Sequence, residues 1–120
     1  MPKILIVDDS PTQRQALINI LKKHNYDIII AEDGQQGVDM SRSEMPDLIL
    51  MDVVMPGLNG FQATRHISKH DSTKDIPIII LTSKDQETDR VWAQRQGAKD
   101  YIIKPATENE LLDKINSFLG

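Results

Sequence analysis

Three aspartates in this chain could together form an acidic metal site. Asp8 and Asp9 directly follow the apolar run ILIV, and Asp52 directly follows the apolar run LILM. Carboxylates that lie close together repel one another unless a cation neutralises them. Oxygen ligands from few side chains favour Mg²⁺, which retains several waters and prefers octahedral coordination. We therefore expect the three aspartates to bind Mg²⁺, and the backbone carbonyl of Val54 to add a further ligand.

Phosphoryl transfer is the chemistry that these residues favour. Thr82 follows the apolar run IIIL and Lys104 follows YII, so a hydroxyl donor and a positive charge join the acids. An aspartate carboxylate can accept a phosphoryl group covalently, and fixed donors and cations stabilise the transferred charge. We expect Asp52 to be the nucleophile, and Thr82 and Lys104 to form the phosphoryl pocket. A cis Lys104–Pro105 bond, which an X-Pro sequence allows at modest cost, would aim the lysine into this site.

Each of these residues, taken alone, has an ordinary structural explanation. An acid pair after a strand often caps a helix, and a single aspartate there is usually a turn residue. A threonine is also a common helix cap, and a lone lysine is usually solvated. The functional interpretation therefore depends on all five side chains following apolar runs at the same end of the fold.

The apolar runs themselves are typical of a parallel sheet. They are rich in isoleucine and do not alternate with polar residues, which is the pattern of strands covered on both faces. The expected strands are residues 4–7, 28–31, 48–51, 78–81 and 101–103.

Helix signals lie between the apolar runs. Ser10 and Gln13 match a capping box around Pro11, which suits the first helical position. Gly97 suits the end of the fourth helix. The expected starts of the other helices are Asp33, Asn59, the polar stretch 83–96 and Thr107.

This alternation of strands and helices predicts one domain over residues 1–120. Right-handed crossovers would connect five parallel strands and five helices into a doubly wound α/β fold of three layers. Ligands of such folds bind beyond the carboxyl ends of the strands, where the aspartates, Thr82 and Lys104 are expected.

Composition and charge exclude several other classes of protein. The chain has no cysteine, which excludes a disulfide framework and thiolate metal ligands. Its formal net charge is −4 and no block of basic residues is present, so nucleic acid is not an expected partner. The first apolar run is too short for a signal peptide or a membrane span, and we expect a cytoplasmic protein without membrane insertion.

Four stretches of the chain carry a resemblance to a known family. ILIVDDS, LILMDVVMPGLNG, IIILTSKD and DYIIKP resemble the CheY-like receiver domains of bacterial two-component response regulators, and the similarity covers residues 3–119. It implies a flavodoxin-like sheet of order 2-1-3-4-5, and a regulatory phosphoacceptor rather than an enzyme. It also implies that Asp52 accepts a phosphoryl group from a histidine kinase. The magnesium ligands that it implies are Asp8, Asp9, Asp52 and the Val54 carbonyl.

The resemblance further implies a switch that reports phosphorylation. Thr82 and Lys104 would contact the phosphoryl oxygens, and Tyr101 matches the aromatic residue whose rotation accompanies activation. The expected output surface is the fourth helix, the fifth strand and the fifth helix, which would bind a protein target that the sequence does not identify.

Some positions depart from the common pattern of the family. Ser83 stands where a small Ala or Gly is frequent, and this side chain would crowd access to the acyl phosphate. Val54 and Lys84 occupy positions that tune dephosphorylation, and neither is an acid or amide that could orient a water. We therefore expect slow loss of the phosphoryl group.

The chain ends soon after the fifth predicted helix, so we expect a stand-alone regulator with no output domain. The stretches MDVVMPGLNGFQATRHISK and TSKDQETDRVWAQRQGAKDY are similar to those of a single-domain regulator of type IV pilus twitching motility. The alternative is a chemotaxis-type effector, or a phosphate sink, in another two-component pathway.

The sequence disfavours three other classes of protein. A haloacid dehalogenase-type phosphatase needs a second aspartate where Val54 stands, and a flavodoxin needs aromatic residues that are scarce here. A degenerate receiver that only binds protein is disfavoured by the complete set of acids, threonine and lysine. Trp92 is expected to pack in the core, and its alternative role is to anchor a partner.

Overall fold

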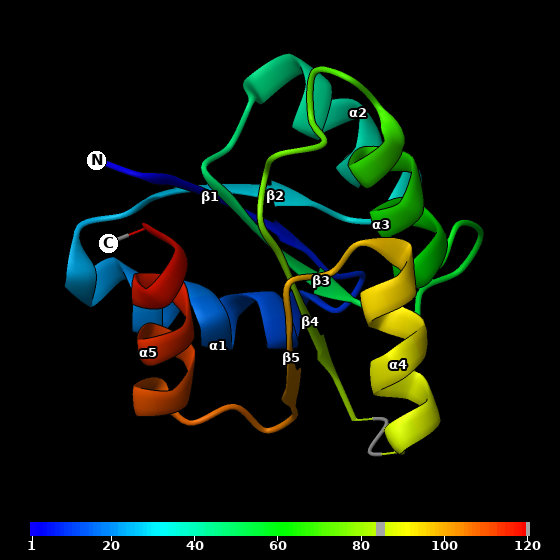
Figure 1. Cartoon of the computed structure of the whole chain (residues 1–120). Coiled ribbons are helices and arrows are strands. Elements are labelled where there is room, and N and C mark those ends of the chain that lie inside the picture. Colours follow the sequence, from blue (N-terminus) through cyan, green and yellow to red (C-terminus); the bar gives the residue numbers. More distant parts are fainter. Residues whose placement is uncertain (84–85, 120) are drawn as a thin grey trace.

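A five-stranded parallel sheet forms the centre of the molecule (Figure 1). The structure is a computed structural model that describes residues 1–83 and 86–119. The strand order β2-β1-β3-β4-β5 confirms the predicted topology. Each predicted strand is extended by one residue, and the observed strands are β1 Lys3–Val7, β2 Asp27–Ala31, β3 Leu48–Asp52, β4 Ile78–Thr82 and β5 Asp100–Ile103.

Five α-helices follow the strands, as predicted. They are α1 Pro11–Leu21, α2 Gly34–Glu44, α3 Gly60–Lys69, α4 Glu87–Gln96 and α5 Glu108–Leu119, and a 3₁₀ turn, Lys22–His24, extends α1. The side chains of Ser10, Asp33 and Asn59 accept hydrogen bonds from backbone N–H groups three residues further on, which confirms them as N-caps. Gly97 ends α4 with a φ of 111°, a conformation that suits glycine.

One detail of the helix predictions is wrong. The capping box predicted at Ser10 and Gln13 is only half formed, because the Ser10 N–H donates to Asp8 while the Gln13 side chain contacts Lys104. Helix α4 lies within the polar stretch 83–96 that was expected to contain it. Residues 84 and 85, which belong to that stretch, lie outside the described residues.

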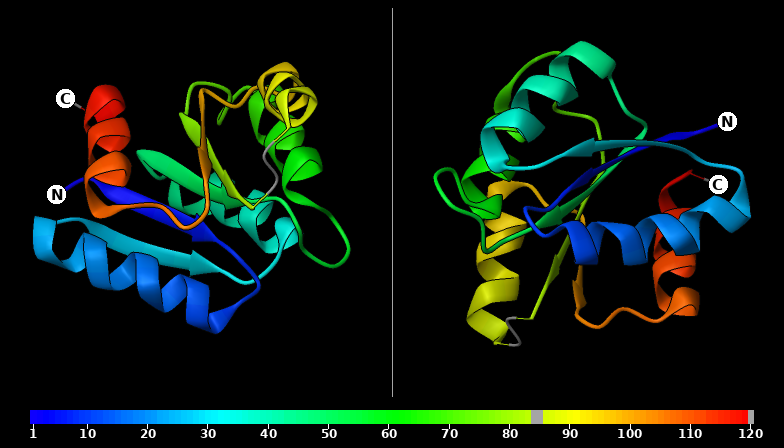
Figure 2. Two further views of the ribbon diagram at one scale, coloured as in Figure 1. Left: turned by 90° about the horizontal axis from the view of Figure 1, so that it is seen from below. Right: turned by 180° about the vertical axis from the view of Figure 1, so that it is seen from behind.

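The helices cover the sheet on both faces. Helices α1 and α5 lie on one face, and α2, α3 and α4 lie on the other (Figures 1 and 2). Alternate residues of a strand point to opposite faces, so Leu5 and Val7 belong to one apolar cluster while Ile4 and Ile6 belong to the other. Each fully buried Ile or Leu side chain contributes about 1.5–3 kcal/mol to stability. Among the described residues, no helix combines the length and apolar character that crossing a membrane requires.

Strand β2 is less covered than its sequence predicted. Ile28 and Ile29 are half-buried, and Ile30 is 37% exposed. The strand lies at the edge of the sheet and pairs only with β1. Burial on both faces was therefore a correct prediction for the central strand β3, where every residue is buried, and a wrong one for β2.

The strand register brings the predicted site together at one edge of the sheet. Val7 of β1 pairs with Met51 of β3. The residues that come next in sequence, Asp8 and Asp52, therefore lie side by side at the ends of adjacent strands. A glycine is required beside them, because a Cβ at Gly60 would lie 2.0 Å from the carbonyl oxygen of Asp52. Helix α3 can therefore begin directly against the end of β3.

Candidate functional site

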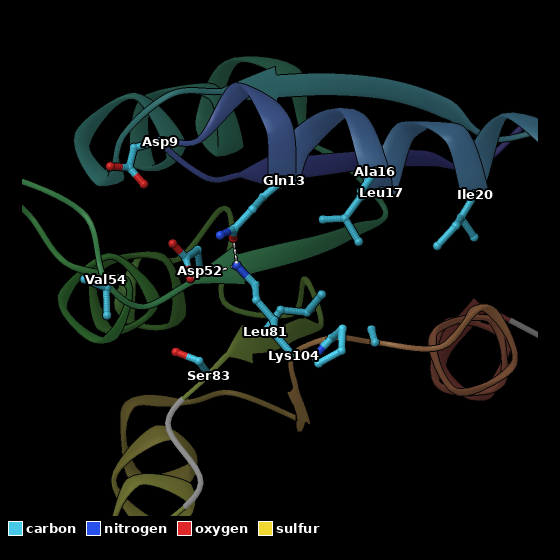
Figure 3. A pocket seen from close by; sticks show the side chains of 12 residues that line it. Asp9, Gln13, Ala16, Leu17, Ile20, Asp52, Val54, Leu81, Ser83 and Lys104 are labelled. Carbon is cyan, nitrogen blue, oxygen red and sulfur yellow. Dashed lines mark hydrogen bonds and ion pairs between the residues drawn. The ribbon is translucent and has the colours of Figure 1, made fainter.

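An acidic cluster occupies the carboxyl edge of the sheet. Asp8, Asp9 and Asp52 each present a carboxylate oxygen, and these atoms lie within 4.8 Å of one another. Asp8 is 2% exposed and Asp52 is 9% exposed, whereas Asp9 is open to solvent. Figure 3 shows Asp9 and Asp52 on facing sides of the cleft, with Val54 beside them. The predicted gathering of acids distant in sequence is thus observed.

Asp8 is held rigidly by its neighbours. Its Oδ1 atom accepts a hydrogen bond from the backbone N–H of Ser10 at 2.9 Å, and its Oδ2 atom accepts one from Lys104 Nζ at 3.2 Å. Its backbone carbonyl accepts a further bond from Arg14 Nη1 at 2.8 Å. These contacts set the orientation of the Asp8 carboxylate in the cleft.

Lys104 lies between the acids. Its Nζ atom is 3.2 Å from both Asp8 Oδ2 and Asp52 Oδ1, and it also donates to Gln13 Oε1. The side chain is 19% exposed, so these ion pairs are partly shielded from water. The Lys104–Pro105 bond is cis, a conformation that the X-Pro sequence allowed.

The acid cluster fits a divalent cation. Among the described residues, Lys104 is the cation that forms ion pairs with the cluster, and its single charge cannot balance three carboxylates in a partly buried cleft. Oxygen donors of this kind suit a hard ion such as Mg²⁺. Val54 lines the same cleft as Asp9 and Asp52, which is consistent with its predicted role as a carbonyl ligand.

The environment of Asp52 raises its pKa above the ordinary value for aspartate. Burial is the main cause, and the negative charge of Asp8 acts in the same direction. The charge and hydrogen bond of Lys104 oppose this shift, as does the backbone N–H of Val53. A poorly solvated carboxylate of raised basicity is a good nucleophile once it is ionised.

Thr82 is the last residue of β4, near the acids, whereas Tyr101 lies near the start of β5 and pairs in register with Ile80. Thr82 is 1% exposed and pairs in register with Ile103, directly before Lys104. Tyr101 is 7% exposed, and the guanidinium of Arg90 lies 5.0 Å from the centre of its ring. Ser83, unlike Thr82, lines the cleft, and Lys84 lies outside the described residues.

The cleft is larger than the predicted site. Its volume is about 520 Å³, and it continues from the acids along an apolar wall. One face of α1 contributes Gln13, Ala16, Leu17 and Ile20, and Leu81 lies opposite them (Figure 3). Pro105 and Ala106 also line the cleft. Sequence reasoning missed Gln13 and this wall. The signal was present, because residues 13, 16, 17 and 20 recur at the spacing of one helix face.

Trp92 does not pack in the core, which corrects the first interpretation of this residue. Its side chain is 49% exposed, and the neighbouring Val91 is 39% exposed. Helix α4 instead buries Ala93 and Gln96.

The chain is similar over its whole length to known proteins. The family model of the Response regulator receiver domain matches residues 4–116. The chain is 56% identical over 120 residues to Protein PilH of Pseudomonas aeruginosa, and the similarity covers 100% of this chain and 99% of that protein.

Solved structures agree in fold. Chemotaxis protein CheY4 of Vibrio cholerae is 28% identical with a TM-score of 0.92, and 98% of each chain is covered. The receiver domain of a sensor histidine kinase of Pseudomonas aeruginosa PAO1 is 32% identical with a TM-score of 0.92, covering 99% of this chain and 98% of that one. That structure has a magnesium ion coordinated in its active site cleft.

Proposed function

Because this chain belongs to the response regulator receiver family, we propose that it accepts a phosphoryl group on Asp52 from a histidine kinase. The observation that carries the proposal is the cluster of three carboxylates at the carboxyl edge of the sheet, two of which, Asp8 and Asp52, form ion pairs with Lys104. This arrangement supplies a nucleophile, a fixed positive charge and oxygen ligands within one cleft.

The transfer step requires the ionised form of Asp52. A carboxylate oxygen attacks phosphorus and forms a P–O bond, while the P–N bond to the kinase histidine breaks and its electron pair returns to the imidazole nitrogen. The protein catalyses only this transfer to itself and the later hydrolysis, so it acts as a regulatory phosphoacceptor. The donor histidine must reach Asp52 through the mouth of the cleft, where Asp9 and Val54 are exposed.

Asp8, Asp9, Asp52 and the carbonyl of Val54 are the residues that would hold Mg²⁺. The ion, when bound, would neutralise the carboxylates and the incoming phosphoryl oxygens. Lys104 holds its ammonium beside Asp52 before the phosphoryl group arrives, so its charge needs little reorganisation during transfer. The hydroxyl of Thr82 would donate to a phosphoryl oxygen.

Phosphorylation would be transmitted by a change of populations. The phosphoryl group carries about −1.5 to −2 charge, which exceeds the carboxylate charge that it replaces, and it attracts Thr82 and Lys104 and favours a conformation in which Tyr101 is rearranged. Two states that differ by a few kcal/mol would exchange populations in this way. The proposed output surface is α4, β5 and α5, and its target is a protein.

This switch has a direct spectroscopic test. Phosphorylation should shift amide NMR signals of residues 83–119 and leave those of β2 nearly unchanged. Identical spectra throughout residues 83–119 would show that the proposed output surface does not respond.

We further propose that the pathway is the control of type IV pilus twitching motility, in the cytoplasm, by a stand-alone receiver domain. The similarity to Protein PilH over nearly the full length of both proteins supports this choice. A chemotaxis-type effector or a phosphate sink remains the alternative. If a kinase phosphorylates this protein and the phosphorylated form binds no target protein, the phosphate sink is favoured.

The phosphoacceptor is tested by intact mass after incubation with acetyl phosphate and Mg²⁺. The wild type should gain one phosphoryl group, and the Asp52→Asn variant should gain none. A phosphoryl group on the variant would place the acceptor elsewhere. Omitting Mg²⁺ should strongly slow the gain, and equal rates with and without the ion would refute the proposed metal site. The decay of the modified mass measures the lifetime, which is expected to be long.

A further inference from the structure

The side chain of Gln13 lies in the cleft instead of capping its own helix. In a capping box, a glutamine at this position would accept a hydrogen bond from the N–H of Ser10. That N–H already donates to Asp8 Oδ1 at 2.9 Å, so it is not available to the glutamine. The Gln13 side chain extends toward β5 instead, and its Oε1 atom accepts a hydrogen bond from Lys104 Nζ (Figure 3).

We propose that Gln13 is a positioning residue for phosphoryl transfer, which holds the ammonium of Lys104 in place beside Asp52. The inference rests on the proposed phosphorylation of Asp52. Gln13 and Lys104 are 91 residues apart in sequence, so this contact also connects α1 to the segment that follows β5.

The hydrogen bonds of Lys104 account for this role. An ammonium group has three N–H donors, and here they meet three acceptors: Asp8 Oδ2, Asp52 Oδ1 and Gln13 Oε1. When Asp52 becomes an acyl phosphate, its carboxylate charge is lost. The N–H of Lys104 that donated to Asp52 Oδ1 can then donate to a phosphoryl oxygen. Asp8 and Gln13 would keep the other two donors, so the ammonium stays where the new charge develops. A positive charge that is already in position stabilises the charge of the transition state without a cost of reorganisation.

A neutral amide suits this position better than a carboxylate. A third acid beside Lys104 would hold the ammonium as well, but it would repel the phosphoryl oxygens that must arrive there. The amide oxygen of Gln13 provides an acceptor without adding a charge. Gln13 is thus expected to assist transfer without being a metal ligand or a reacting group.

The test compares two glutamines of the same helix. Gln13→Leu removes the contact with Lys104, whereas Gln15→Leu removes a hydrogen bond of 2.9 Å to Asn19 outside the cleft. Both residues are exposed and leucine is a good helix former, so both variants should fold. Phosphoryl uptake from acetyl phosphate with Mg²⁺ is followed by intact mass.

Gln13→Leu should slow uptake about two- to tenfold, which corresponds to the loss of one hydrogen bond, and Gln15→Leu should leave the rate unchanged. In a Lys104→Met background, Gln13→Leu should cause no further slowing, because the group that it positions is absent.

Equal rates for wild type and Gln13→Leu would overturn the inference alone, provided that the wild type gains its phosphoryl group. Equal slowing in both backgrounds would also overturn it, since a merely structural role does not depend on Lys104. A wild type that gains no phosphoryl group would overturn the proposed function and this inference together.

Discussion

Replacing Lys104 with methionine is expected to destabilise the metal-free protein by about 3 kcal/mol. The substitution keeps most of the side-chain volume but removes the cation that lies 3.2 Å from both Asp8 Oδ2 and Asp52 Oδ1. Removal of one partner from a buried ion pair costs about 3–5 kcal/mol, because the other charge stays buried and unpaired. The low end applies here, since the Lys104 side chain is 19% exposed.

A second lysine provides a matched control. Lys114 Nζ lies 3.0 Å from Asp100 Oδ1, which is closer than the contacts of Lys104, but the two side chains are 29% and 31% exposed. Ion pairs that are open to solvent contribute about 0–1 kcal/mol. Lys114→Met should therefore lower the free energy of unfolding by at most about 1 kcal/mol. The more buried ion pairs, and not the shorter one, should then show the larger loss of stability.

Urea unfolding of the wild type and both variants, with and without Mg²⁺, measures these costs. Mg²⁺ should bind more tightly to Lys104→Met than to the wild type, because no ammonium then competes for the carboxylates. A tenfold lower Kd at saturating Mg²⁺ would reduce the difference in stability by about 1.4 kcal/mol. The loss should also shrink at acid pH, because the raised pKa of Asp52 lets this group take up a proton and relieve the repulsion. A larger cost for Lys114→Met, or a cost for Lys104→Met that Mg²⁺ does not reduce, would refute the reasoning.

Three further outcomes are expected. Burial raises the pKa of Asp52, and only the ionised form attacks phosphorus. Initial rates of phosphorylation by acetyl phosphate should therefore fall on acidification at a higher pH than for an ordinary aspartate. A rate that stays constant down to the usual aspartate range would contradict this. Gly60→Ala should lower the free energy of unfolding by about 1–3 kcal/mol or more in urea titrations, since its Cβ would lie 2.0 Å from a backbone oxygen. Trp92→Leu should change that free energy by at most about 0.5 kcal/mol, because the ring is 49% exposed; a loss of about 3–5 kcal/mol would instead indicate a core residue.

Most residues of the acidic cluster and its lysine could be predicted, because they directly follow apolar runs in the sequence. Parallel strands place their carboxyl ends at one edge, so Asp8, Asp52 and Lys104 were expected at the same edge once the runs became strands. The strand order that brings them close together was implied only by the family resemblance. Observed contacts of 3.2 Å between the lysine and both acids agree with this argument.

Edge and surface positions could not be predicted in the same way. Ile30 and Trp92 are apolar in sequence, yet they are 37% and 49% exposed. Whether an apolar side chain is covered depends on which strand lies at the edge of the sheet and how the helices pack, and composition contains no such information.

The sequence by itself determined the strands, the helices and the placement of the acids and Lys104 at one edge of the sheet, because these follow from local patterns and from the geometry of parallel sheets. Only the tertiary structure decided the role of Gln13. Its side chain had two possible partners, the N–H of Ser10 nearby and the ammonium of Lys104 far along the chain. The nearby donor was already bound to Asp8 Oδ1, and that competition arises only when the folded chain brings all the groups together.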